Sequence, residues 1–383
     1  MGCDCRSFET KAVHGNKPYD LVTGAISVPI YQCATFRHEG VGRSTGYDYS
    51  RVQNPTREEL EKTLAILENG KECLAFTSGM AAISNLFTVF SPGDHIILSE
   101  DLYGGTYRVT EEIFNKYGLT SSYVDTSGLS SLIENIRKNT KAIFIETPSN
   151  PMMRITDLKA VVAIAKERNI LTIVDNTFLS PYFQKPLDLG IDIVVHSGTK
   201  YLSGHNDTLS GFVILNDLTL AEKLRNIQKS IGACLPAFDS WLTLRGIKTL
   251  AIRLDRQQEN AIKIAKWLKN HKNIEQVFYP GLEDHKGHEI LKEQASGYGA
   301  MISFVVDSEE TAKRILERVK IILFAESLGG VETLITYPEQ QTHANIPENM
   351  RNRVGVTSKL LRISVGIENV DDLINDLKGA LED

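Results

Sequence analysis

Short apolar runs recur between residue 73 and residue 216, and each ends in polar or small residues. The runs are rich in β-branched and aromatic side chains, which indicates buried strands. Segments with helical apolar spacing separate them. This alternation predicts an α/β fold with a mostly parallel sheet and helices on both faces. The predicted strands cover residues 73–78, 95–100, 121–126, 141–147, 171–176, 192–197 and 211–216.

Other patterns flank this region. The first 52 residues are rich in Gly, Pro, Ser and Thr and show no long helical period, so they are predicted to form an extended arm that packs onto a second subunit. Thr56 is predicted to cap the first helix, with Glu59 as its partner in a capping box. Helical spacing over residues 218–271 predicts a long helical stretch between two domains.

The last part of the chain alternates short strand-like pieces with amphipathic helices, which predicts a smaller C-terminal α/β domain. The predicted strands there cover residues 277–280, 301–307 and 360–366, and the predicted helices cover residues 309–319 and 371–381. We therefore divide the chain into an arm at 1–52, a larger α/β domain at 53–250 and a C-terminal α/β domain at 251–383.

Composition narrows the possible partners. With 383 residues, 42% hydrophobic and 23% charged, the chain has the balance of a globular protein, and no apolar run approaches the ~20 residues of a membrane-spanning helix. A net charge of −6 without a basic block argues against nucleic acid. Five cysteines, an odd and scattered set, fit a reducing cytoplasm. The start, MGCDC, is interpreted as a frayed terminus, because the lipidation pattern needs Ser or Thr where Arg6 stands.

The strongest chemical signal is VVHSGTKYLSGHND at residues 194–207. Lys200 lies there among small and hydroxylated residues directly after an apolar strand. A lone lysine in a turn is most often solvated, but a lysine with a lowered pKa forms imines with carbonyl substrates or with pyridoxal phosphate. Ser197 and Thr199 flank it with hydroxyls suited to a phosphate. His205, which follows, is interpreted as a structural hydrogen-bonding residue.

Three other strand ends carry matching chemistry. Asp175 follows the strand in LTIVDNTF, where an acid can hold a pyridinium nitrogen protonated. Ser78 and Gly79 begin an apolar helix, and helix N-termini bind phosphate. Asn150 closes AIFIETPSNP. Because α/β sheets bind ligands beyond the carboxyl ends of their strands, these groups are expected to meet.

In these stretches the chain resembles the pyridoxal-phosphate enzymes of transsulfuration, the family of cystathionine γ-lyase, γ-synthase and β-lyase. The resemblance covers nearly the whole chain and implies the aspartate-aminotransferase-like fold, fold type I of pyridoxal-phosphate enzymes. One small departure is Gly198, where many relatives have alanine. The matching stretches are GYDYSRVQNPTR, FTSGMAA, DLYGGTYR, ETPSNP, VDNTF, HSGTKYLSGHND, FAESLGGVETL and LRISVGIE.

The resemblance implies roles for individual residues. Lys200 would hold pyridoxal phosphate and move protons, Asp175 would keep its ring nitrogen protonated, and Tyr103 would stack on the ring and protonate the departing sulfur, although a buried tyrosine can also be a core residue. Tyr49 would assist catalysis from the neighbouring subunit's arm. The cofactor-binding set is Ser78, Gly79, Met80, Tyr103, Asn150, Asp175, Thr177, Ser197, Thr199, Lys200, Tyr49 and Arg51.

A second set is assigned to the substrate. Arg362 alternates with strand residues that point inward, where an unpaired guanidinium is costly, and the resemblance gives it the substrate α-carboxylate with Asn150 and Ser327. Cystathionine has a second ammonium and carboxylate beyond its sulfur. Charged residues near the site are assigned to them, with a solvated charge set as the alternative; these are Glu326, Arg108 and Asp48.

The favoured function is a lyase that splits L-cystathionine by β- or γ-elimination, in a homotetramer whose active sites are shared between subunits. The sequence leaves β and γ open. The rival reaction is γ-replacement, by a cystathionine γ-synthase or O-acylhomoserine sulfhydrylase, and the rival class is a silent binding protein, which the lysine and its partners disfavour. No metal is expected, because His285 and His288 have metal-like spacing without further ligands and are interpreted as a solvated loop.

Overall fold

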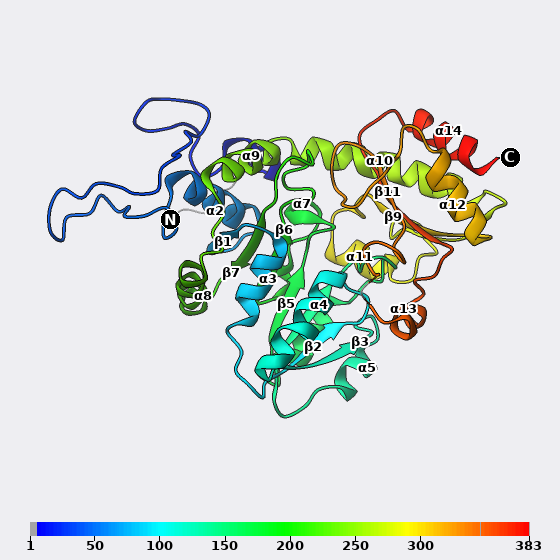
Figure 1. Ribbon diagram of the computed structural model, residues 1–383, viewed down its shortest axis with the longest axis horizontal. Helices are drawn as coiled ribbons and strands as arrows, with labels where there is room; N and C mark the ends of the chain where they lie inside the picture. The colour runs from blue at the N-terminus through cyan, green and yellow to red at the C-terminus, as the bar shows by residue number, and fades with distance from the viewer. Residues whose placement is uncertain (1–5, 345, 383) are drawn as a thin grey trace.

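The computed structural model describes residues 6–344 and 346–382. Cys3 and Cys5, in the segment interpreted as a frayed terminus, lie outside this range. Figure 1 shows a large α/β unit, a smaller one beside it, and an N-terminal segment that projects from the large unit.

The larger sheet consists of the seven strands that the sequence predicts, in the order β1-β7-β6-β5-β4-β2-β3. Strands β2 to β6 run parallel to one another, whereas β7 is antiparallel to both of its neighbours, β1 and β6. The mostly parallel sheet is therefore confirmed. The bounds are β1 Glu72–Phe76, β2 His95–Ser99, β3 Thr120–Val124, β4 Thr140–Glu146, β5 Leu171–Asp175, β6 Ile193–Ser197 and β7 Gly211–Leu215.

Helices cover both faces of this sheet because successive strand residues point to opposite sides. In β6, Ile193 and Val195 belong to the apolar cluster of α3 and α8, whereas Val194 belongs to that of α2 and α9. The helices of this unit are α2 Pro55–Leu67, α3 Gly79–Phe87, α4 Gly104–Glu112, α5 Leu129–Glu134, α6 Leu158–Lys166, α7 Ser180–Phe183, α8 Leu218–Ile231 and α9 Ala237–Ile247, with short 3-10 helices at Phe114–Tyr117 and Pro186–Leu189.

Helix α2 begins earlier than predicted. Asn54 is its N-cap, and its side-chain oxygen accepts a hydrogen bond from the Thr56 N–H at 3.0 Å. Pro55 occupies the first helical position, which its fixed φ suits. Glu59 accepts a hydrogen bond from the Lys17 N–H at 3.0 Å and so ties the arm to the helix. The predicted capping box was therefore wrong.

The predicted helical stretch over residues 218–271 is three separate helices. Helix α8 ends at Gly232, whose φ of 87° favours glycine. Pro236 then precedes α9, and α10, Leu250–Lys269, begins after a second break. Of these three helices, only α10 runs along the small unit (Figure 1). It packs there against strands β8 and β9. The bridge between the two units is thus much shorter than predicted.

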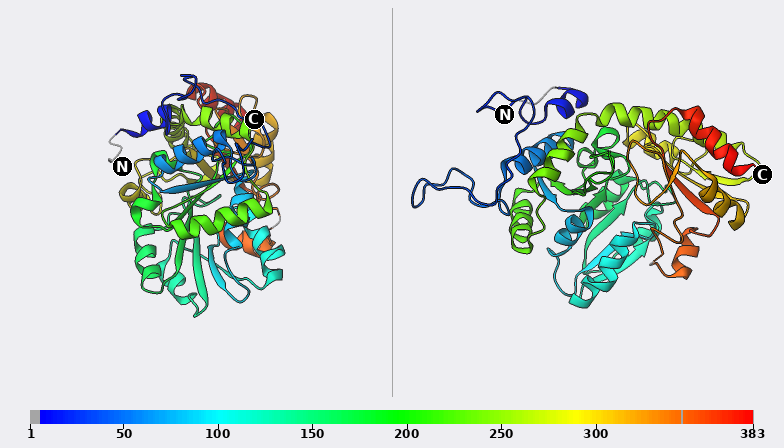
Figure 2. Two further views of the ribbon diagram at one scale, coloured as in Figure 1. Left: turned by 90° about the vertical axis from the view of Figure 1, so that its left-hand side faces the viewer. Right: turned by 45° about the horizontal axis from the view of Figure 1, so that its top comes forward.

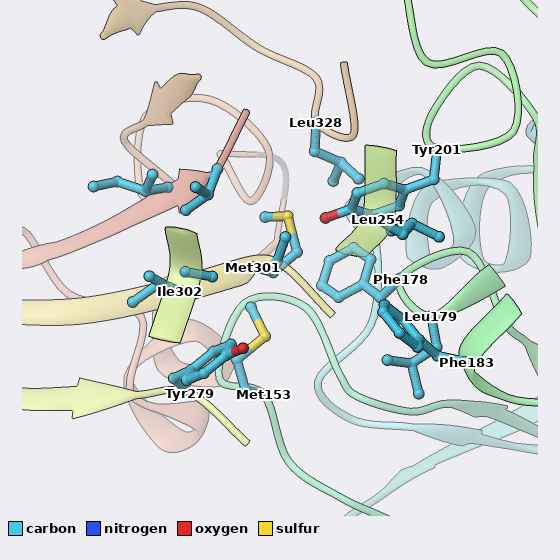
Figure 3. Packing of buried hydrophobic residues seen from close by; sticks show 14 of the residues in the cluster. Met153, Phe178, Leu179, Phe183, Tyr201, Leu254, Tyr279, Met301, Ile302 and Leu328 are labelled. Carbon is cyan, nitrogen blue, oxygen red and sulfur yellow. The ribbon is translucent and has the colours of Figure 1, made fainter. Parts of the chain in front are cut away.

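The small unit contains a second sheet in the order β10-β11-β12-β9-β8, in which only β10 and β11 pair in parallel. Figure 3 shows Met301 of β9 beside Phe178 of the large unit, whereas Ile302 lies farther toward Tyr279; all belong to one apolar cluster. The two units therefore share a core. The bounds are β8 Ile274–Phe278, α11 His288–Gln294, β9 Met301–Val306, α12 Glu309–Arg318, β10 Leu323–Phe324, β11 Leu334–Thr336, α13 Glu348–Val354, β12 Leu360–Ser364 and α14 Val370–Leu381.

The arm begins with a short helix that the sequence did not reveal, α1 Phe8–His14, which packs on α2 and α10. Residues 15–53 contain neither helix nor strand, and most of them project away from the body of the molecule (Figures 1 and 2). Their apolar side chains are largely uncovered, among them Leu21, Val22, Ile26 and Val41. In a single chain the arm has little to pack against.

Candidate active site

A cavity of about 200 Å³ lies at the carboxyl ends of β4, β5 and β6 and is closed by the loop after β10 and by β12. This is the edge where parallel sheets bind ligands. The cavity brings together most of the predicted site residues, namely Ser78, Gly79, Met80, Tyr103, Asn150, Asp175, Thr177, Ser197, Thr199, Lys200, Glu326, Ser327 and Arg362.

Lys200 follows β6, and its Nζ donates a hydrogen bond to Ser327 Oγ at 2.8 Å. Burial lowers the pKa of this lysine to about 8, because the ammonium loses water. The nearby charge of Arg362 lowers the pKa further, and that of Glu326 opposes the shift. A lysine with such a pKa is partly neutral near physiological pH, as a nucleophilic amine must be.

Asp175 ends β5, beside the lysine strand. Its Oδ1 accepts two hydrogen bonds from Thr177, from the N–H at 3.0 Å and from the hydroxyl at 2.5 Å. The same hydroxyl oxygen accepts from the Ser197 N–H at 2.8 Å, so Thr177 connects the ends of β5 and β6. Burial raises the pKa of Asp175, and the Thr177 hydrogen bonds oppose this. A cationic ring nitrogen at this place would stabilise the carboxylate.

The N-terminus of α3 and the end of β6 form a small cradle. Ser78 caps the helix, because its Oγ accepts a hydrogen bond from the Ala81 N–H at 3.1 Å. A Cβ added to Gly79 would lie 2.9 Å from Ser197 Cβ, so the close approach of the helix to β6 requires glycine. Free N–H groups at a helix N-terminus, together with the hydroxyls of Ser197 and Thr199, fit a phosphate.

Arg362 lies in β12 with only 1% of its surface exposed. One of its terminal nitrogens donates to Asn150 Oδ1 at 2.6 Å, and the other donates to Ser327 O at 3.3 Å and Thr336 Oγ1 at 3.2 Å. Among the described residues, Nε has no hydrogen-bond partner. Burial lowers the pKa of Arg362 to about 10, so the group is still a cation at neutral pH. Such a group attracts a carboxylate.

Comparison with known proteins identifies the family. A family of Cys/Met metabolism PLP-dependent enzymes matches residues 9–382. The chain belongs to this family. Its cofactor is accordingly pyridoxal phosphate, PLP, and the protein is an enzyme.

Members of this Cys/Met metabolism family with different names are about equally similar to the chain. It is 50% identical to the cystathionine γ-lyase of Bacillus subtilis (strain 168) over 98% of this chain and 99% of the relative. It is 48% identical to the cystathionine β-lyase of Lactococcus lactis subsp. cremoris (strain MG1363), with the same coverage. The crystal structure of cystathionine γ-lyase from Lactobacillus plantarum complexed with L-serine has a TM-score of 0.96, 44% identity and 98% coverage of both chains. The predicted fold type is thereby confirmed.

The cavity also contains groups that sequence reasoning missed. Glu146 ends β4 and is buried, and its Oε2 accepts a hydrogen bond from the Tyr103 N–H at 2.9 Å. Burial, followed by the charge of Asp175, raises the pKa of Glu146. The sequence did contain a signal for Glu146, because this acid ends an apolar strand. The neighbouring strand in the sheet ends in Asp175, which pairs with Glu146. Thr342 lies in an irregular segment that offered no comparable signal.

Four predicted site residues lie outside the cavity of their own chain. Arg51 donates to the Lys229 carbonyl oxygen at 2.5 Å and lies 5.4 Å from the ring centre of Tyr49. Asp48 accepts a hydrogen bond from a neighbouring hydroxyl of the arm, and Arg108 is exposed on α4. A single chain therefore assembles the strand-end residues but not those of the arm.

The histidines have structural partners. His205 lies 2.7 Å from the Ser203 carbonyl oxygen, as its predicted structural role requires. His285 and His288 contact the carbonyl oxygens of Met153 and Pro280, each at 2.8 Å, and His288 is buried, so the solvated-loop prediction was wrong. Within the described ranges, no group of three or more His, Cys, Asp or Glu could hold a metal ion, and no helix is long and apolar enough to cross a membrane.

Proposed function

We propose that the protein is a PLP-dependent carbon–sulfur lyase that cleaves L-cystathionine to an amino thiol, a 2-oxo acid and ammonia. The observation that carries the proposal is the single cavity in which Lys200 Nζ, Asp175 and Arg362 meet. It combines an amine of lowered pKa, an acid for a ring nitrogen and a cation for an amino-acid carboxylate. The names of the relatives support cystathionine as the substrate.

The bound cofactor would supply the electron sink that makes bonds next to the substrate amine easy to break. Lys200 would attach it and, once free, would move a proton at the substrate α-carbon. Asp175 would keep the ring nitrogen protonated, while the cradle of Ser78, Gly79, Met80, Ser197 and Thr199 would hold the phosphate. Arg362, with Asn150 and Ser327, would orient the α-carboxylate.

The remaining groups would act at the sulfur end of the substrate. Tyr103 is 40% exposed and lines the cavity, where it would stack on the cofactor and donate a proton to the departing sulfur. Glu326 also lines the cavity and would pair with the distal ammonium. Arg108 and Asp48 would contribute further charges at that end.

We also propose that two chains share each active site, in a tetramer built from two dimers. The projecting arm would carry Tyr49 and Arg51 to the cofactor of the neighbouring subunit. There the planar guanidinium of Arg51 would donate hydrogen bonds to two phosphate oxygens at once. A two-fold axis would exchange the two arms reciprocally. The arm's uncovered apolar side chains support this arrangement. A reducing cytoplasm is proposed as the location, supported by the free thiols of Cys33, Cys73 and Cys234.

Product analysis with L-cystathionine tests the proposal. We expect ammonia with a 2-oxo acid, which is pyruvate for β-elimination and 2-oxobutanoate for γ-elimination. An enzyme that leaves cystathionine intact but forms it from an O-acylhomoserine and cysteine would instead be a γ-synthase. A protein that takes up no PLP and turns over neither substrate set would be the silent binding protein.

A further inference from the structure

The turn at residues 149–152 connects the cavity to groups outside it. Its central side chain, Asn150, is buried and accepts the 2.6 Å hydrogen bond from Arg362. A guanidinium on a long side chain is oriented by the groups that accept its hydrogen bonds. The direction in which Arg362 points therefore depends on how firmly the turn holds the Asn150 amide.

Residues of both units hold the ends of this turn. Asp101, which is buried just after β2, accepts hydrogen bonds through Oδ2 from the Ser149 hydroxyl and from the Met152 N–H, the latter at 3.2 Å. Burial raises the pKa of Asp101 to about 6, so it is an ionised acceptor at neutral pH. From β9 of the small sheet, Ser303 Oγ donates to the Pro151 carbonyl oxygen at 2.6 Å.

His343 holds the middle of the turn. Its side chain is buried, with Nε2 lying 3.1 Å from the Asn150 carbonyl oxygen and Nδ1 lying 2.8 Å from Thr342 Oγ1. Because a carbonyl only accepts, Nε2 carries the proton and Nδ1 accepts from the threonine hydroxyl. Burial and the charge of Arg362 lower the pKa of His343 to about 4, so the ring is neutral at working pH. Asn150 is thus fixed through its main chain while its side chain holds Arg362.

We infer that Asp101 and His343 are positioning residues for the substrate-carboxylate site, which they set through Asn150. Neither side chain lines the cavity, so neither can touch the substrate directly. The inference rests on the proposed function, because it takes Arg362 as the carboxylate-binding group. Loss of either residue should weaken the binding of ligands that have a carboxylate and spare ligands that do not. A purely structural role would weaken both kinds equally.

The test compares glycine with methylamine, two amines that differ only in the carboxylate. Each is titrated into the PLP-loaded enzyme, and the absorbance of the bound cofactor reports its Kd. For His343→Leu we expect the glycine Kd to rise about tenfold, because the variant loses one buried hydrogen bond to the turn. The methylamine Kd should stay within about twofold. His343→Gln, which can still donate to the Asn150 carbonyl, should restore most of the affinity. His288→Leu is the matched control, because it removes a similar buried histidine–carbonyl contact, to Pro280 away from the turn, and should change neither Kd.

Asp101→Ala should likewise raise the glycine Kd and spare the methylamine Kd, whereas Asp101→Asn should keep most of the glycine affinity. This second pair of variants keeps the test decisive if His343→Leu does not fold. Equal losses for glycine and methylamine, or no loss in either disruptive variant, would overturn the inference. Failure of the proposed function looks different: the wild-type enzyme itself would then leave cystathionine intact, whatever its glycine Kd.

Discussion

The ends of the large-sheet strands and the N-terminal arm both carry residues that we assign to the cofactor, but the two regions hold these residues differently. Sheet register places Asp175 and Lys200 in one cavity within a single chain. Tyr49 and Arg51 belong to the arm and do not line that cavity; in its own chain, Arg51 donates to the Lys229 carbonyl oxygen. The comparison indicates that a rigid sheet can build a site by itself, whereas an arm without a core of its own can serve a site only by packing against another surface, which we propose is another subunit.

The largest effect is expected at the strand ends. Lys200→Ala should lose the covalently held cofactor and at least about 10³-fold in turnover, because the group that moves the substrate proton is gone. Borohydride reduction and peptide mapping of the yellow wild-type protein should find the pyridoxyl group on Lys200. Lys185→Ala is the control, since Lys185 is another lysine whose pKa burial lowers, but it lies outside the cavity. An adduct on any other lysine would contradict the assignment.

The arm should contribute to cofactor affinity rather than to its covalent attachment. Arg51→Ala removes charge-assisted hydrogen bonds to the phosphate, each worth about 1.5–3 kcal/mol, so the Kd for PLP should rise about 10- to 100-fold. Equilibrium dialysis measures it. Arg43→Ala, a change in the same arm at a residue whose side chain donates to the arm's own Glu39 carbonyl oxygen, should leave the Kd unchanged. Equal losses in both variants would mean that Arg51 only supports the fold of the arm.

Substrate choice should depend on Glu326, in the part of the cavity wall formed by the loop after β10. Glu326→Ala should lower kcat/KM for cystathionine by about one to two powers of ten, the worth of one charge-assisted hydrogen bond. Homocysteine, which has no distal ammonium, should be affected far less. Glu332→Ala is the control, because Glu332 pairs with Asn206 outside the cavity lining. A similar loss on both substrates would show that Glu326 supports the site without selecting the substrate.

The smallest effect concerns pH. Only the neutral amine of Lys200 can attack the cofactor aldehyde, so PLP uptake by cofactor-free protein should accelerate as the pH rises and level off above the pKa of about 8. Below that value the rate should fall about tenfold per pH unit. Stopped-flow absorbance measures it. A rate that still climbs steeply at pH 10, as for an ordinary lysine, would contradict the burial argument. Arg51→Ala should change the rate but not the midpoint.

Much of the large unit follows from the sequence because most of its strands, the edge strand β3 excepted, are buried on both faces. Continuous apolar runs that end in Asp175 and Ser197 are typical of strands buried in a parallel sheet. The parallel pairing of these strands brings their ends together. Glu146 could have been found by the same logic. The capping box predicted at Thr56 was wrong because Asn54, two residues before Thr56, caps the helix and Pro55 occupies its first position.

Other features depend on contacts between distant segments, which no local pattern reports. His343 lies in an irregular stretch and meets Asn150 only in the folded chain. The breaks between α8, α9 and α10 had visible signals in Gly232 and Pro236, but the helical apolar spacing continued across them. The arm's proposed destination lies in another molecule, so neither the sequence nor one chain displays it.

The measurement that tests shared active sites most directly is complementation between two inactive variants. Arg51→Ala and Lys200→Ala subunits are mixed and allowed to exchange at a PLP concentration too low to load Arg51→Ala. If sites are shared across a two-fold interface, random hybrids should recover about a quarter of the wild-type activity, because half of the dimers are hybrids and each has one intact site. Activity no higher than that of the unmixed variants, with hybrids verified by mass spectrometry, would show that each site is built from one chain.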